Sequence, residues 1–171
     1  MLPNIRVTGQ MQVKAKEIAI FRRDLARKNN CIPIFQTDSL KDEIVGILGE
    51  DIFKIWLDQN KIPYERKVVH READHGDFII YGKIVDVKCA SLYYYKMIMM
   101  PLKQFLKNKR DFYVGVRLNL VEGFVDIMGV ATHDELYKAP VRDFGHNIDT
   151  KAFPFSKLTP IEEMIIQRRL T

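Results

Sequence analysis

The stretch that most constrains the fold is residues 75–90, HGDFIIYGKIVDVKCA, which has the pattern of a β-hairpin. Residues 77–81 and 84–89 have the composition and length of two short strands. Gly82 and Lys83 lie between them, and a type II′ turn has glycine at the first of its two central positions. The hairpin is therefore predicted to turn at Gly82–Lys83.

This turn predicts which residues stand opposite each other in the hairpin. Tyr81 would oppose Ile84, and counting outward places Asp77 opposite Lys88. Because side chains of a strand alternate between its two faces, Asp77, Asp86 and Lys88 are expected to share one face. The second strand is apolar enough to lie inside a sheet, where unpaired charges are rare. Two carboxylates and a lysine are thus predicted to converge at one sheet edge.

The other face of the second strand carries Val85, Val87 and Cys89, which are expected to be core. A plain alternative exists for the charged face. Lys88 could form a solvated surface ion pair with either aspartate, a common arrangement that contributes little stability.

A helix is expected upstream, over residues 37–60, with three possible N-cap residues at positions 37–39. Glu50 lies at the margin of the apolar stripe of this helix and is predicted to look toward the sheet. Glu43 lies two turns earlier on nearly the same line and is the competing candidate. An ordinary helical ion pair of Glu50 with Lys54, four residues later, is the simple alternative.

These residues in this order resemble the PD-(D/E)XK nuclease superfamily: Glu50 on a helix, Asp77 after a glycine at a strand start, and Asp86-Val87-Lys88 on the next strand. The resemblance covers roughly residues 40–130. Two departures are visible, since His-Gly precedes Asp77 where the family name has proline, and the second acid is aspartate. The resemblance implies an α/β restriction-endonuclease-like sandwich with a mixed central β-sheet flanked by helices, and the predicted element order agrees with it.

The resemblance implies a divalent-metal-dependent nuclease that hydrolyses DNA phosphodiester bonds. Asp77 and Asp86, with the backbone carbonyl of Val87, are the expected ligands of Mg²⁺, for which Mn²⁺ can substitute. Glu50 is expected to act directly or through a bound water. Lys88 is expected to orient the attacking water and to stabilise charge on the phosphorane.

Several functions remain open at this stage. An endonuclease on duplex DNA is favoured, and a structure-selective enzyme such as a Holliday junction resolvase is the main alternative. A catalytically inactive nucleic-acid-binding module and a structural domain with surface ion pairs are the others. A homodimer is expected, because one site cuts one strand and two-fold symmetry pairs two sites.

Charge is distributed unevenly along the 171 residues, whose net charge is +5. Residues 87–110 hold six basic residues and no acid, which suits a phosphate backbone beside an acidic metal site. The expected nucleic-acid contacts in this segment are Lys96, Lys103, Gln104 and Lys107. Tyr93, Tyr94 and Tyr95 could stack on bases, but core packing of at least two of them is favoured.

The length and the 47% hydrophobic content predict a single domain. Its expected parts are a basic helical extension (residues 1–38, with a helix over 10–29), a catalytic core (about 40–130), and an irregular segment followed by a C-terminal helix (138–171). Three further strands are expected, over residues 64–72, 111–120 and 124–131. A helical crossover, interrupted at Pro101, is expected over residues 91–109. Capping boxes at residues 132–135 and 159–162 predict the starts of a short helix and of the C-terminal helix.

The remaining signals concern location and metals. Cys31 and Cys89 have no metal or redox spacing and are expected to be reduced thiols in a cytoplasm. His70 and His75 are too few for a zinc site and are expected to be loop residues. No apolar run is long enough to span a membrane.

Overall fold

The computed structural model describes residues 5–28, 39–66, 77–92, 94–107, 109–145 and 147–163. In chain order its elements are α1 (Gly9–Lys28), α2 (Ser39–Gln59), β1 (Glu65–Arg66), β2 (Phe78–Ile80), β3 (Lys83–Ala90), β4 (Met97–Pro101), α3 (Leu102–Lys107), β5 (Phe112–Asn119), β6 (Phe124–Thr132), α4 (His133–Lys138), β7 (Val141–Arg142), β8 (Thr150–Pro154) and the 3₁₀ helix η1 (Phe155–Lys157). No helix in this part of the chain is both long and apolar enough to cross a membrane.

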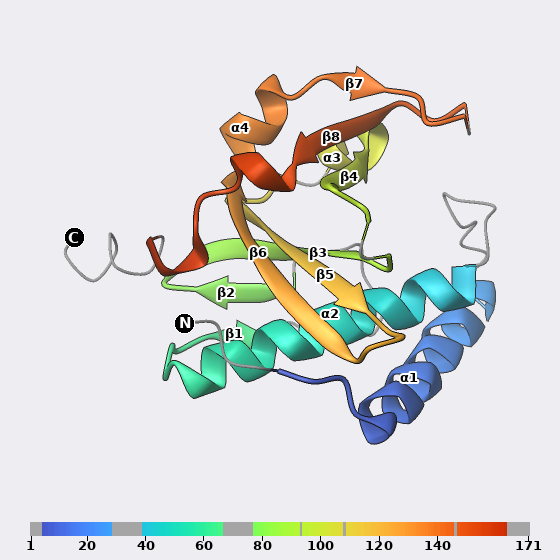
Figure 1. Ribbon diagram of the computed structural model, residues 1–171. Coiled ribbons are helices and arrows are strands. Elements are labelled where there is room, and N and C mark those ends of the chain that lie inside the picture. Colours follow the sequence, from blue (N-terminus) through green and yellow to red (C-terminus); the bar gives the residue numbers. More distant parts are fainter. Residues whose placement is uncertain are drawn as a thin grey trace.

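A five-stranded mixed sheet, ordered β1-β2-β3-β5-β6, forms the centre of the fold. β3 and β5 are parallel, and the other neighbours are antiparallel. Helix α2 covers one face and α1 packs against α2, while a smaller sheet ordered β4-β8-β7 lies with α3 and α4 on the other side (Figure 1). The expected α/β class, with a mixed central sheet flanked by helices, is confirmed.

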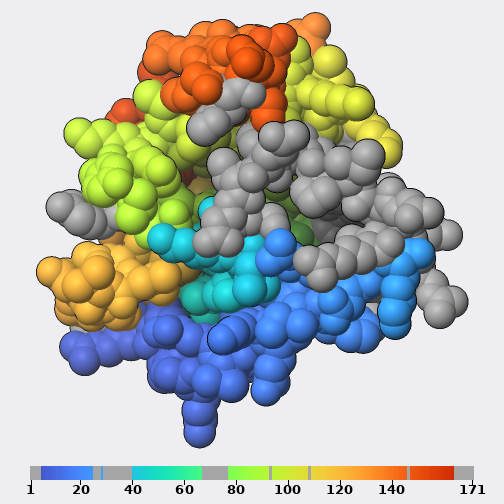
Figure 2. All heavy atoms as spheres, turned by 90° about the vertical axis from the view of Figure 1, so that its right-hand side faces the viewer, coloured from blue at the N-terminus to red at the C-terminus, as the bar shows by residue number. Residues whose placement is uncertain are grey.

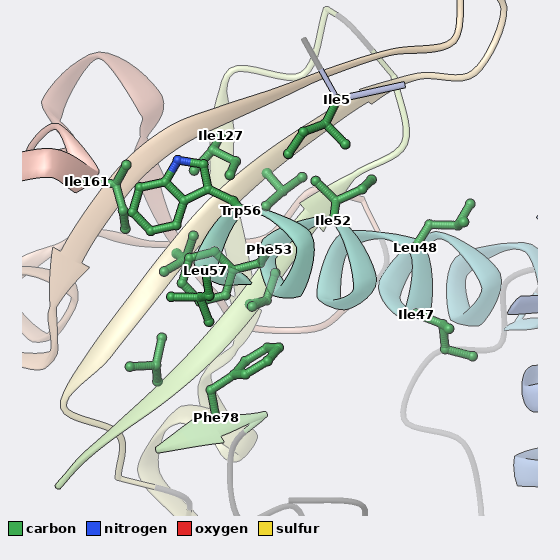
Figure 3. Packing of buried hydrophobic residues seen from close by; sticks show 14 of the residues in the cluster. Ile5, Ile47, Leu48, Ile52, Phe53, Trp56, Leu57, Phe78, Ile127 and Ile161 are labelled. Carbon is green, nitrogen blue, oxygen red and sulfur yellow. The ribbon is translucent and has the colours of Figure 1, made fainter. Parts of the chain in front are cut away.

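The main core lies between α2 and the central sheet. Figure 3 shows the apolar side chains of α2 directed at the strands, among them Phe53 and Trp56. Phe53 meets Phe78 edge to face, with ring centroids 5.3 Å apart. Gly49 lets the helix approach β3 closely, because a Cβ there would lie 2.7 Å from the Cβ of Cys89. This close packing brings the neighbouring residue Glu50 near β3.

The hairpin forms, but the predicted turn and register are wrong. The two turn residues are Tyr81 and Gly82, both with positive φ (49° and 74°), as in a type I′ turn. Phe78 pairs with Val85, so Asp77 does not oppose Lys88. Both members of this pair are fully buried, and their burial outweighs the cost, about 1 kcal/mol, of a left-handed tyrosine.

The register is displaced by two residues, which is one full period of side-chain alternation. The displacement therefore leaves every side chain on its predicted face. Val85 and Val87 are buried in the main core, and Cys89 packs against it half-buried. This part of the prediction is confirmed.

The segment after the hairpin differs from its prediction. Residues 97–101 form strand β4 instead of the first part of a helical crossover, and only residues 102–107 are helical. The partner of β4 is β8, at residues 150–154, inside a stretch that is predicted to be irregular. Local pattern could not identify this sheet because each strand is stabilised by a partner about 50 residues away.

The other helices follow the sequence closely. α1 and α2 match their predicted ranges to within two residues. The capping box at the start of α4 is present, with Thr132 and Glu135 bonded reciprocally. Residues 161–163 begin the expected C-terminal helix. Its remainder, most of the strand expected over 64–72, Cys31, His70 and His75 lie outside the described residues.

The prediction that at least two of the three tyrosines pack in the core is wrong. Tyr94 is 56% exposed and Tyr95 is 38% exposed. Their rings contact each other edge to face at 5.3 Å. They lie in the short connection between β3 and β4, which leaves the central sheet and offers these side chains no core to enter.

Candidate functional site

Asp86 and Lys88 lie on the face of β3 that points away from α2. Val87 and Cys89 lie close to Gly49 of that helix, so strand alternation directs the even-numbered residues to the opposite face. Asp86 is only 3% exposed. The ammonium of Lys88 lies 2.6 Å from its Oδ2 atom. The predicted acid and lysine are therefore neighbours in a largely buried setting and not a solvated surface pair.

The Oδ2 atom of Asp86 has an unusual environment. It is buried and accepts no hydrogen bond among the described residues, although the ammonium of Lys88 is close. The contact between the Lys88 ammonium and this oxygen is therefore an ion pair whose angles do not meet those of a hydrogen bond. A buried carboxylate oxygen that accepts no hydrogen bond can also bind a metal cation.

Asp77 joins this group from the residue before β2. Its Oδ2 atom accepts a hydrogen bond of 2.6 Å from the backbone N–H of Val87. Burial raises the pKa of Asp77 well above 3.8, and the charges of Asp86 and Glu50 raise it further, against the opposing effects of Lys88 and the Val87 hydrogen bond. The hydrogen bond places the carboxylate of Asp77 beside Val87, the residue between Asp86 and Lys88.

Glu50 approaches from the opposite side of β3. Its Oε2 atom lies 3.1 Å from Arg66 on β1 and 3.5 Å from Arg22 on α1. Arg66 also pairs with Asp51 at 2.8 Å. Burial raises the pKa of the Cys89 thiol most, and the negative charge of Glu50 raises it further. Cys89 lies on the α2 side of the strand, beside Gly49. Glu50 is therefore bound to arginines instead of lying against Lys88, and the predicted alternative pair with Lys54 does not form, since Lys54 bonds Asp58.

The competing acid Glu43 is half-buried on the same helix. Burial raises its pKa most, and the charge of Glu50 adds to this effect, while Arg22 and Arg23 lower the pKa. Glu43 and Glu50 thus share one arginine-rich environment. Of these two acids, Glu50 is the one whose charge adds to the raised pKa of Asp77, and this favours Glu50 as the acid associated with the site.

Arg110 is a site residue that the sequence did not single out. It is 6% exposed and its Nε atom lies 3.8 Å from Oδ1 of Asp86. The sequence showed it only as one member of a basic segment. Its position just before β5 becomes informative only once β5 is known to be the parallel neighbour of β3.

Tyr113 lies beside Asp86 on the neighbouring strand, since the two are register partners. Its hydroxyl lies 3.2 Å from Nδ1 of His133. Burial first, and then the charge of Asp86, raise the pKa of Tyr113 to about 12, against the opposing charges of Lys88 and Arg110 and a hydrogen bond with the Arg110 backbone. Tyr113 is neutral at physiological pH and forms an uncharged wall of the site.

The donor set suits a hard divalent cation in part. Asp77 and Asp86 supply carboxylate oxygens, and Oδ2 of Asp86 accepts no hydrogen bond. The negative charge of Asp86 raises the pKa of Asp77, and a bound cation would offset this repulsion. Within the described ranges, no group of three His, Cys, Asp or Glu side chains is placed to hold a metal. Asp77 and Asp86 are therefore the two candidate carboxylate ligands, and the described residues do not bring Glu50 together with them as a third.

The predicted nucleic-acid contacts lie on α3 and just before β4. Lys103 and Lys107 are exposed and one turn apart on α3, whereas Gln104 is half-buried there. Lys96 is exposed just before β4, directly after the two exposed tyrosines. Figure 2 shows the segment that leads from β3 into β4 (lime green) below the β7–β8 region (orange) and above the turn between β5 and β6 (gold).

Comparison with known proteins adds no relative. The chain matches no family model, no curated protein and no solved structure.

Proposed function

We propose that this protein is a divalent-metal-dependent nuclease that hydrolyses DNA phosphodiester bonds, with a restriction-endonuclease-like fold of the PD-(D/E)XK type. One observation carries the proposal. A buried carboxylate, Asp86, forms an ion pair with the partly exposed Lys88 on β3, and the half-buried Asp77 is hydrogen-bonded to Val87 between them. Buried charges are costly, and a cluster of them is a common mark of a functional site.

Asp77 and Asp86 would hold Mg²⁺, with Mn²⁺ as a substitute, assisted by the carbonyl of Val87. The metal would supply charge neutralisation on the phosphate and a water that is more easily deprotonated. Val87 contributes in a second way, because its N–H orients the carboxylate of Asp77. Both ligands are thus positioned by the backbone of β3.

Lys88 would leave its contact with Asp86 and face the phosphate, where an ammonium stabilises the charge that develops in the transition state. Glu50, held by Arg66 and Arg22, would act on the site through a bound water and through its charge. The basic surface of α3 and the Lys96 region would hold the DNA backbone on either side of the cut.

The proposal is tested by incubating the protein with plasmid, linear duplex, single-stranded and four-way junction DNA over a titration of Mg²⁺ or Mn²⁺. Cleavage is expected with either metal and not in EDTA, and Ca²⁺ is expected to support binding with little cutting. Robust cleavage in chelator would exclude the metal mechanism. Binding without cleavage under every metal condition would favour an inactive nucleic-acid-binding module.

A structure-selective nuclease is the second candidate, and the exposed tyrosines favour it. Tyr94 and Tyr95 present aromatic surface beside Lys96. Aromatic rings next to a lysine stack on unpaired bases at about 1–3 kcal/mol per base. Replacing both tyrosines with leucine is expected to weaken binding to junction and single-stranded DNA and to leave binding to linear duplex unchanged. Equal losses on all substrates would argue against this candidate.

A homodimer remains part of the proposal, because two-fold symmetry would pair two sites on the two strands of a duplex. Analytical ultracentrifugation with and without DNA tests it. A monomer in both conditions, together with nicking only, would contradict it.

A further inference from the structure

We propose that Arg110 is a positioning residue that keeps the carboxylate of Asp86 oriented while Lys88 turns to the substrate. The inference rests on the proposed function, since it assigns Asp86 and Lys88 their roles in it. It adds a residue that lies 24 positions beyond Asp86 in the sequence, in the connection between α3 and β5.

The two oxygens of Asp86 each face a different cation. Lys88 lies 2.6 Å from Oδ2, and Arg110 lies 3.8 Å from Oδ1. A carboxylate with only 4% of its side chain exposed cannot rely on water to fix its orientation. Its plane is therefore set by these two partners.

The two cations differ in how freely they can leave. The side chain of Lys88 is 22% exposed, whereas that of Arg110 is 6% exposed. Lysine is a flexible point charge, while the arginine guanidinium is planar and always charged. Lys88 is thus suited to exchange partners, and Arg110 is suited to stay.

The backbone at Arg110 is anchored to β3 itself. The next residue, Asp111, accepts a 2.8 Å hydrogen bond from the N–H of Ile84 through its side chain. The N–H of Asp111 in turn donates to the carbonyl of Ile84 at 2.9 Å. These two bonds hold Arg110 at a fixed position along the strand that carries Asp86.

Tyr113, on β5, adds a further tie between Arg110 and the site. It is fully buried, stands beside Asp86 in the register and contacts His133 through its hydroxyl. It also forms a hydrogen bond with the backbone of Arg110, which links Arg110 to the residue beside Asp86.

The experiment compares Arg110→Met and Arg110→Lys with Arg117→Met, a control on β5 whose arginine pairs with Asp126 at the surface. Turnover and the half-saturating Mg²⁺ concentration are measured separately on plasmid DNA. Arg110→Met is expected to lower turnover at saturating Mg²⁺ by about 10- to 100-fold, as for other residues that orient metal ligands. Arg110→Lys should recover part of the loss, and Arg117→Met should stay within about twofold of wild type.

A purely structural role predicts a different result. Arg110→Met would then lower the unfolding temperature, while the folded fraction turned over DNA at the wild-type rate, and this outcome overturns the inference. If Arg110→Met does not fold, the test is made with Arg110→Lys. Turnover equal to that of wild type in Arg110→Lys would also overturn the inference.

A double-mutant cycle separates this inference from the proposed function. Unfolding temperatures of wild type, Arg110→Met, Asp86→Asn and the double variant are expected to be strongly non-additive, because the two side chains hold each other. If the wild type cleaves no DNA, the proposed function fails, and the cycle alone still decides whether Arg110 orients Asp86. Additive changes in unfolding temperature would show that Arg110 does not act through its contact with Asp86.

Discussion

The ammonium of Lys88 lies 2.6 Å from Oδ2 of Asp86, a residue two positions earlier on the same strand. Both side chains extend from one face of β3, where strand alternation brings residues two apart together. The contact is a charge pair in a place with little water, so its partners attract each other more strongly than a surface pair does.

Lys88→Ala is expected to abolish cleavage and to leave the protein folded. The lysine is the group that would stabilise charge on the phosphate, and removal of one such group costs about 100-fold or more in turnover. The measurement is plasmid cleavage beside thermal unfolding. Lys83→Ala is the control, since Lys83 forms a surface pair with Asp111 at 3.7 Å. Loss of the fold in Lys88→Ala alone would make Lys88 a structural ion-pair partner.

Asp77→Asn is expected to stabilise the protein at neutral pH in chelator. The native pKa of Asp77 is raised well above 3.8, chiefly by burial. Between 3.8 and that raised pKa the native state keeps a proton that the unfolded chain has released. The free energy of unfolding therefore falls as pH rises through this window, and the asparagine variant lacks the decline.

Urea unfolding between about pH 4 and about pH 8 measures this difference, which should grow as pH rises. Asp126→Asn, at the exposed partner of Arg117, is the control. Mg²⁺ should stabilise wild type and not Asp77→Asn. A neutral-pH stability of Asp77→Asn below that of wild type would contradict the environment described for Asp77.

Glu50→Gln is expected to lower cleavage much more than Glu43→Gln. Both acids lie on α2 near arginines, but only Glu50 contributes to the raised pKa of Asp77. Initial cleavage rates at saturating Mg²⁺ are the measurement, with thermal unfolding to correct for stability. The reverse order would move the helical acid of the site two turns toward the N-terminus.

Asp86→Asn is expected to abolish cleavage and to keep or tighten DNA binding in metal-free buffer. The change removes a negative charge that repels the scissile phosphate, and it also removes a metal ligand. Fluorescence anisotropy with labelled duplex measures the affinity. Loss of binding without metal would show that Asp86 supports the DNA-binding surface and does not merely hold the metal.

Replacing Lys103 and Lys107 together with alanine is expected to weaken DNA binding at every sequence. Each lost phosphate contact should reduce the slope of log K against log salt by about one. The matched variant replaces Lys14 and Lys16 on α1, which are also exposed and remove the same charge. Equal slopes for the two variants would show that only net charge matters and that α3 is not the phosphate contact.

The sequence by itself determined the local elements and the faces of the hairpin. Apolar spacing located α1 and α2, and the capping box located the start of α4, because these signals depend on residues within a few positions of each other. Asp86 and Lys88 were assigned to one face of β3 correctly even though the turn was misplaced. A displacement of two residues equals the period of a strand, and it therefore preserves the face of every side chain.

Tertiary structure alone decided the partners of these residues. Arg110 reaches Asp86 only because β5 pairs in parallel with β3, and Arg66 reaches Glu50 only because β1 adds to the sheet edge. The pairing of β4 with β8 likewise joins segments that are far apart in the chain. Such contacts are set by register and packing between distant segments, and local periodicity carries no information about them.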